Sequence, residues 1–358
     1  MSTPALAARR RTPRGAAAFA VLALLLAAGL LLWSKWLPYS ARVGELSGTH
    51  AWSGSSVLAG ASIEAGSGPS PAAGWEFTKV YALAVWKALV AGLVIAAAVQ
   101  TLVPRRWLTA VLRRRSRPSS ALVGGLLSTP SMMCSCCTAP VATALRRSGA
   151  PTAGVVAYWL GNPLLNPAVL VFLVLVAPWQ WAATRFVVGA LLVVGGSALV
   201  ARLAGDRVAA SAVDEVAAQH EEGRDEGPRR FLPVLARMSA YLVPEYLVVV
   251  FAVGTFAGWL FPLGESARSW GVLGVLVALV LGLLLVIPTA GEVPLTQGLA
   301  TAGFGPAVVG ALLIALPAVS LPSAVMVVGA LGRRVVGWTM VVVAAGSLVS
   351  AGLLTVLV

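Results

Sequence analysis

All three cysteines of this 358-residue chain lie in one short stretch, "STPSMMCSCCTAP", as Cys134, Cys136 and Cys137. Thiolates are soft ligands for Cu(I) and zinc, and the same softness suits trivalent arsenic or antimony. A lone cysteine is often only a small buried hydrophobe. Three cysteines within four positions favour a binding role instead. The stretch therefore predicts a site for a thiophilic metal or solute, with the three cysteines as metal ligands and Ser135 among the substrate-binding residues.

Prolines indicate that the cysteine stretch is a broken helix and that a second break exists further along. Pro130 and Pro140 flank the cysteines, and Pro288 and Pro294 lie in "IPTAGEVPLTQG". Each proline lacks an amide donor and clashes with the preceding turn of a helix. Glu292 lies in the second break, where an ionisable side chain in apolar surroundings is a functional candidate. We predict that it carries a coupling proton; a carboxylate satisfied by hairpin amides is the alternative.

The composition is that of a membrane protein. Hydrophobic residues make up 58% of the chain and charged residues 11%, with a mean hydropathy of +0.88, whereas a soluble domain carries roughly a quarter charged residues. Several apolar runs exceed the ~18 residues of a membrane span. The net charge of +13 comes from short basic clusters beside these runs, which follow the positive-inside rule. We expect an all-α polytopic membrane protein that does not bind nucleic acid.

The apolar runs divide the chain into two similar parts behind an extra N-terminal transmembrane helix. We predict spans at 16–37, 77–103, 152–177, 181–203, 239–262, 305–331 and 335–357, with interrupted segments at 119–147 and 271–304. The expected organisation is a cytoplasmic N-tail and first transmembrane helix (1–37), an external Gly/Ser-rich loop (38–76), a first permease repeat (77–203), a charged cytoplasmic linker (204–238) and a second permease repeat (239–358).

An ungapped alignment of residues 134–167 with 288–321 supports a duplication. The matches are Pro140 with Pro294, Leu145 with Leu299, Gly149 with Gly303, and Pro163 with Pro317. With the N-terminus in the cytoplasm, every basic cluster falls on the inside if 119–147 is a re-entrant hairpin. The second half then has the opposite orientation. We predict an inverted repeat of span, re-entrant hairpin, span and span; broken full crossings are the alternative for 119–147 and 271–304.

This architecture predicts a transporter and not an enzyme. Unwound backbone survives in a bilayer only where it lines protein or a water-filled cavity, and paired broken helices place substrate sites near the midplane. Asn162 and Asn166 in "GNPLLNP" and Ser320 in "LPAVSLPS" are candidates for lining that site. The asparagines could equally hydrogen-bond backbone groups freed by neighbouring prolines. Lys87, in the second span, either lines the cavity or reaches towards the membrane surface.

The chain resembles the ArsP-type predicted permeases, a family that includes efflux proteins for trivalent organoarsenicals. The resemblance covers residues 77–358 and rests on a "CSC…P" hairpin with "L-x-x-x-G" (Cys134, Ser135, Cys136, Pro140, Leu145, Gly149), an "N-P" kinked span (162–167), "GEVPL" (291–295) and "SLPS" (320–323). It implies a multi-pass inner-membrane permease whose cysteine hairpin binds a thiophilic substrate. Cys137 departs from the pattern, and the loop at 38–76 lies outside the family core.

The combined prediction is a secondary transporter that exports a thiophilic solute, trivalent organoarsenicals in particular, with a proton as the coupling ion. No cofactor is expected, the surrounding partner is membrane lipid, and a homo-oligomer is left open. One alternative is transport of another metal ion or small solute. A second is a membrane thiol–disulfide redox protein, because Cys134 and Cys137 have a C-x-x-C spacing. Such a protein exchanges thiols between separated cysteine pairs, and the second half has no cysteine.

Overall fold

The structure is a computed structural model that describes residues 13–52, 63, 67–205, 229–267 and 271–358. Every regular element among these residues is a helix. Six helices are long and apolar enough to cross a membrane, and one further pair, bent by 47°, could form a seventh span. The expectation of an all-α polytopic membrane protein is therefore confirmed. Parts of the predicted N-tail (1–12), external loop (53–62 and 64–66) and linker (206–228) lie outside the described residues.

The N-terminal span is longer than predicted. It consists of α1 (Pro13–Leu31), the π-helical turn η1 (Leu32–Trp36) and α2 (Leu37–Thr49). Pro38 has no amide for the carbonyl of Ser34, and the helix accommodates this gap with a π turn. We expected the span to end at 37, but the helix continues to Thr49. Its extension is held by α9, against which Leu46 is fully buried.

Apart from the short helix α5, the two halves contain the same order of elements. The first half comprises α4 (Pro71–Thr101), α5 (Arg105–Leu112), α6 (Arg117–Ser128), the 3-10 turn η2 (Thr129–Ser131), α7 (Ser135–Arg147), α8 (Thr152–Leu164), α9 (Pro167–Val176), α10 (Trp179–Leu191), the π turn η3 (Leu192–Gly196) and α11 (Ser197–Ala204). The second comprises α13 (Phe231–Ala267), α14 (Val272–Leu284), α15 (Glu292–Thr301), α16 (Pro306–Ala318), α17 (Leu321–Leu331) and α18 (Arg333–Leu357).

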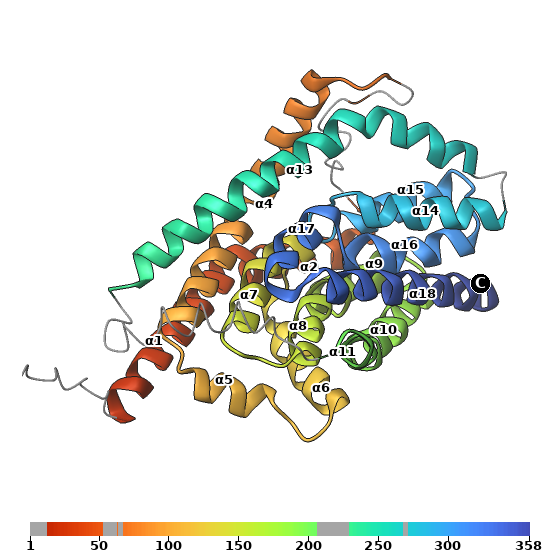
Figure 1. Ribbon diagram of the computed structural model, residues 1–358. Coiled ribbons are helices and arrows are strands. Elements are labelled where there is room, and N and C mark those ends of the chain that lie inside the picture. The colour runs from red at the N-terminus through yellow and green to blue at the C-terminus, as the bar shows by residue number, and fades with distance from the viewer. Residues whose placement is uncertain (1–12, 53–62, 64–66, 206–228, 268–270) are drawn as a thin grey trace, which may run out of the picture.

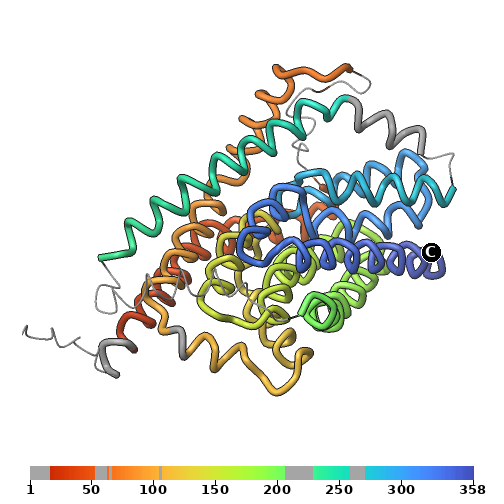
Figure 2. Tube along the Cα trace, in the orientation of Figure 1, coloured from red at the N-terminus to blue at the C-terminus, as the bar shows by residue number. Residues whose placement is uncertain are grey.

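This order is a long helix, an interrupted pair, a kinked pair and a final span. It agrees with a duplication, while the inversion of one half relative to the other stays a prediction. The long helices α1, α4 and α13 run side by side along one flank of the molecule (Figure 1), as the chain trace also shows (Figure 2). The final spans α10 and α18 pack together with α16, and α7 lies among α4, α8 and α17. The cysteine-bearing helix is thus surrounded by elements of both halves.

The segment from α6 to α7 has the geometry of a hairpin. Its two ends, Arg117 and Arg146, line the same cavity, so the chain enters and leaves on one side. A helix of 12 residues, the length of α6, extends only about 18 Å, whereas the hydrocarbon core of a bilayer is about 30 Å thick. The cysteines lie at the far end of the hairpin, well away from its base.

Candidate functional site: a buried thiol cluster

The tip of the first hairpin is formed by an irregular turn between α6 and α7. Pro130 lies in the 3-10 turn η2, and Met132 follows in the left-handed region with φ of 48°. The chain then becomes extended at Cys134, which is the residue directly before α7. Because Cys136 and Cys137 fall in the first turn of that helix, the turn brings all three cysteines to one place.

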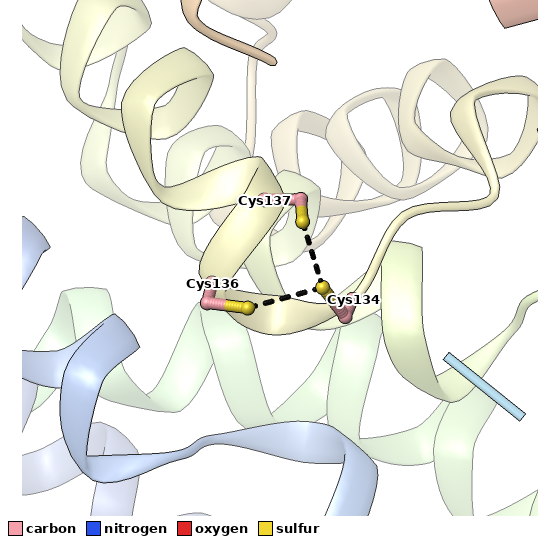
Figure 3. A group of neighbouring side chains, drawn as sticks. All are labelled: Cys134, Cys136 and Cys137. Carbon is pink, nitrogen blue, oxygen red and sulfur yellow. Dashed lines mark hydrogen bonds between the residues drawn. The ribbon is translucent and has the colours of Figure 1, made fainter. Parts of the chain in front are cut away.

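The three thiols point towards one another (Figure 3). The sulfur of Cys134 lies 3.1 Å from that of Cys136 and 2.9 Å from that of Cys137. All three sulfurs lie within 4.8 Å of one another. The residues are buried, with no more than 5% exposed, and none forms a disulfide. This convergence could present two or three sulfur ligands to one soft centre.

A tyrosine of the first half contacts the cluster and packs in turn against a tyrosine of the second half. The hydroxyl of Tyr81, on α4, lies 3.9 Å from the sulfur of Cys136. The ring of Tyr81 in turn contacts that of Tyr246, on α13, with 6.1 Å between centroids. The Tyr246 hydroxyl is buried and has no hydrogen-bond partner. A buried hydroxyl without a partner is costly, which makes Tyr246 a candidate contact for a bound solute.

Helix α4 approaches the cluster closely at Gly92. A Cβ atom at this position would lie 2.3 Å from the carbonyl oxygen of Cys137. The missing side chain therefore allows the backbone of α7 to pack directly on α4. Sequence reasoning gave no sign of this contact, since glycine is common in membrane helices.

We expect Gly92→Ala to destabilise the protein by about 1–3 kcal/mol, the range for overpacking a tight contact. The clash is with backbone, so the first turn of α7 must shift and carry the cysteines with it. Thermal unfolding of the purified protein in detergent measures the effect. Gly329→Ala in α17 is the matched control, because a Cβ there meets nothing within 4 Å. Equal stability of both variants would contradict the close contact.

Asn162 holds the hairpin tip in place. Its Oδ1 accepts hydrogen bonds from the Ser131 hydroxyl and from the Met133 amide, the latter at 3.3 Å. Its Nδ2 donates to the carbonyl oxygen of Tyr158 at 3.0 Å. Asn162 is therefore occupied with positioning the turn that carries the cysteines. Its partners are groups of the hairpin turn and of α8, and the carbonyl freed by Pro163, that of Trp159, is not among them. A role in lining the substrate site stays a prediction.

Ser320 and Asn166 both lie directly before a helix in a kinked pair. Ser320 precedes α17 in a capping box with Ser323, and its hydroxyl lies 3.2 Å from that of Ser135. This contact joins the second half to the residue between Cys134 and Cys136. Asn166 caps α9 through its Oδ1, while its Nδ2 is buried without a partner.

Two of the four prolines predicted to break helices do not lie at breaks. Pro130 and Pro288 are in the interrupted segments, as expected. Pro140 instead lies inside α7, where it leaves the carbonyl of Cys136 without an amide donor one turn later. Pro294 lies in the first turn of α15, where amides have no partner within the helix and a proline is tolerated.

The second break contains a buried ion pair. Glu292 begins α15, and its Oε1 accepts a hydrogen bond from Nη2 of Arg185, on α10, at 2.8 Å. Arg185 has no exposed surface and also donates to the carbonyl oxygens of Pro163 at 2.7 Å and Leu164 at 3.3 Å. Arg185 therefore connects the second break to the kink between α8 and α9.

Sequence reasoning singled out Glu292 but missed Arg185. The signal was present, because an arginine within the span predicted at 181–203 meets the same criterion of an ionisable group at membrane depth. Glu292 is satisfied by this arginine and not by hairpin amides, which corrects the alternative considered for it.

The N-terminal span contacts both breaks through consecutive residues of its π turn. Nε1 of Trp36 donates to the carbonyl oxygen of Pro130 at 2.7 Å. Nζ of Lys35 donates to the hydroxyls of Thr289 and Tyr39, each at 3.2 Å. Lys35 is only 6% exposed, so these two hydroxyls hold a buried ammonium between the N-terminal span and the second break.

Lys35, and not Lys87, lies beside the second break. The side chain of Lys87 is exposed and lies over the rings of Trp33 and Trp86. Sequence reasoning examined Lys87 and overlooked Lys35, although Lys35 lies within the span predicted at 16–37.

A polytopic helical bundle whose broken helices meet in its interior has the architecture of a membrane permease. Residues 74–356 match the family described as predicted permease, and the chain therefore belongs to the ArsP-type predicted permeases. It is also similar to UPF0718 protein YraQ of Escherichia coli (strain K12), with 37% identity over 334 residues, 93% of this chain and 94% of the relative. No solved structure matches. These matches confirm a multi-pass membrane permease.

Proposed function

We propose that this permease exports a thiophilic solute, in particular a trivalent organoarsenical, through the thiol cluster of the first hairpin. The observation that carries the proposal is the convergence of three free, buried sulfurs within 4.8 Å at a helix break. The contact between Ser135 and Ser320 supports a position between the two halves, where transporters of this design hold their substrates.

The chemistry of the cluster fits such a solute. A monosubstituted trivalent arsenical that carries two hydroxyls condenses with two thiols, forming two As–S bonds and releasing two molecules of water. Cys134 is central, because its sulfur lies within about 3 Å of both others. The remaining thiol can then replace one of the two bound sulfurs on the arsenic. The solute would thereby pass from one pair of sulfurs to another within the site.

Glu292 is the proposed proton carrier. Its carboxylate is buried and bound to Arg185, so protonation would remove one charge of the pair and free the guanidinium. Arg185 also holds the kink between α8 and α9 through two carbonyl groups. Proton uptake at Glu292 would thereby change the contacts of Arg185 that hold this kink in the first half of the permease.

The direct test is accumulation of a monosubstituted trivalent organoarsenical in a host strain without its own arsenic exporters. Cells that express the permease should accumulate less than cells with the empty vector, and everted membrane vesicles should take the compound up when a proton gradient is imposed. Parallel assays with Cu(I) and Zn(II) distinguish the alternative of a metal-ion transporter. Equal accumulation with and without the protein would refute the arsenical assignment.

A redox role is the second candidate, because the sulfurs of Cys134 and Cys137 are only 2.9 Å apart. A disulfide between them would have to pass its electrons to another thiol pair, and the chain has no further cysteine. Mass spectrometry of protein alkylated in intact cells tests this role. A Cys134–Cys137 disulfide that forms and disappears with the redox state of the cell would favour it over transport.

Lys35 offers a sharper test of the site. We expect Lys35→Met to misplace the second break, whose Thr289 it binds, and so to lower the initial rate of organoarsenical uptake into everted vesicles. Loss of this buried charged hydrogen bond should also destabilise the protein by about 1.5–3 kcal/mol. Lys35→Arg should recover part of the rate because it keeps the charge. Lys87→Met is the matched control and should transport normally. A normal rate for Lys35→Met would place Lys35 outside the functional site.

A further inference from the structure

A cavity of about 750 Å³ lies at the base of the first hairpin, away from the thiol cluster at its tip. It is bounded by the segment between α5 and α6, the end of α7, the start of α8 and the end of α11. Six arginines line it: Arg113, Arg114, Arg115, Arg117, Arg146 and Arg202. No carboxylate is among the described residues that line it, and the six guanidinium groups give this lining a positive charge.

The local backbone adds to this positive charge. Helices α6 and α8 both begin at the cavity, and helix N-termini carry partial positive charge. The first turn of α8 has no side-chain cap, so its amides are not used by a capping residue. Arg146, at 3% exposed, is the buried arginine of the six, and its Nη1 donates to the carbonyl oxygen of Ala150 at 3.0 Å. The cavity therefore combines one fixed arginine with five exposed ones around a space suited to anions.

Apolar side chains extend from the cavity along the adjoining helices. Leu199 lines the cavity and is 44% exposed, and Leu203 follows one turn later on α11. On α6, Leu122 and Leu126 are also exposed. Since α6 packs against α11, these leucines provide an apolar surface beside a basic pocket. A phospholipid has this combination of an anionic headgroup and acyl chains, whereas a free phosphate ion would need no apolar surface.

We propose that the arginine cavity binds the headgroup of an anionic phospholipid, with its acyl chains lying along α6 and α11. Basic pockets between membrane helices are known to recognise phosphate headgroups. The size of the cavity and its exposed run of Arg113, Arg114 and Arg115 favour a headgroup with two phosphates over one with a single phosphate. The bound lipid would hold the base of the hairpin whose tip carries the cysteines.

The test uses the full-length protein in nanodiscs of zwitterionic phospholipid, titrated with a fluorescent diphosphatidyl lipid, a phosphatidylglycerol or inorganic phosphate. Arg113, Arg114 and Arg115 are changed together to Gln. Each arginine near a membrane surface contributes about fivefold to binding, so the triple variant should bind the diphosphatidyl lipid about a hundredfold more weakly. Arg333→Gln/Arg334→Gln removes exposed basic residues at the start of α18 and should leave binding unchanged.

Three outcomes would overturn the proposal. Equal weakening in both variants would mean that the lipid responds only to general surface charge. Inorganic phosphate that competes as strongly as the lipid would identify a site for a free anion. Unchanged binding in the triple variant would exclude the cavity, provided that thermal unfolding shows the variant to be folded.

Discussion

Replacing Cys134, Cys136 and Cys137 together by serine is expected to raise organoarsenical accumulation to the level of cells without the permease. Serine keeps the approximate size of the side chains and a polar group, so the hairpin should still form. Its hydroxyl is a hard ligand and does not replace a thiolate towards a soft centre. Loss of the two As–S bonds should therefore abolish binding and transport together. Accumulation and direct binding to the purified protein measure both effects.

Single substitutions should show how much each of the three sulfurs contributes to binding and transport. Cys134→Ser is expected to be the most damaging, because Cys134 is the sulfur close to both others. Cys137→Ser should retain partial transport if two thiols suffice. Gly329→Ser, which adds a hydroxyl on α17 where a Cβ meets nothing within 4 Å, is the control and should behave as the unaltered protein. A triple variant that still lowers accumulation would show that the sulfurs do not carry the solute.

Removing one member of the ion pair between Arg185 and Glu292 should have the largest effect on stability. Arg185→Met leaves a buried carboxylate without its partner, which costs about 3–5 kcal/mol, and also frees the carbonyls of Pro163 and Leu164. We expect a much lower unfolding temperature and little transport. Glu292→Gln is milder, because an amide oxygen can still accept a hydrogen bond from Arg185. Thermal unfolding in detergent provides the comparison.

The double variant Arg185→Met/Glu292→Leu distinguishes a structural role of the ion pair from a role in proton coupling. Replacement of a whole buried ion pair by apolar residues is often neutral or stabilising, so its unfolding temperature should exceed that of Arg185→Met. If Glu292 carries the proton, the folded double variant should no longer respond to a proton gradient. Uptake that still follows the gradient would assign the pair to structure alone.

The sequence predicted the parts of this molecule that depend on local chemistry. Apolar runs gave the spans because length and hydropathy decide membrane insertion, and the spacing of Cys134, Cys136 and Cys137 suggested a common site because they are nearly adjacent. The interrupted segments were likewise found from their prolines and small residues.

What the sequence did not reveal depends on contacts between distant elements. Arg185 contacts Glu292, 107 positions further along the chain, and Lys35 contacts Thr289, 254 positions further along. No local sequence pattern connects residues that are so far apart. Pro140 was misplaced because a helix held on several sides can accommodate a proline. The extension of the first span to Thr49 was missed because its polar composition resembles a loop, whereas in the structure it packs against α9.

The N-terminal helix connects the two breaks through neighbouring residues of its π turn. Trp36 and Lys35 are neighbours in the chain, yet one holds Pro130 and the other Thr289. The breaks cannot separate without loss of at least one of these hydrogen bonds. Losing both would cost on the order of 2–4 kcal/mol, so a conformation with separated breaks would be disfavoured by about thirtyfold or more. The resting permease should therefore populate almost solely the joined conformation, and a solute that opens it must replace those two bonds with its own contacts.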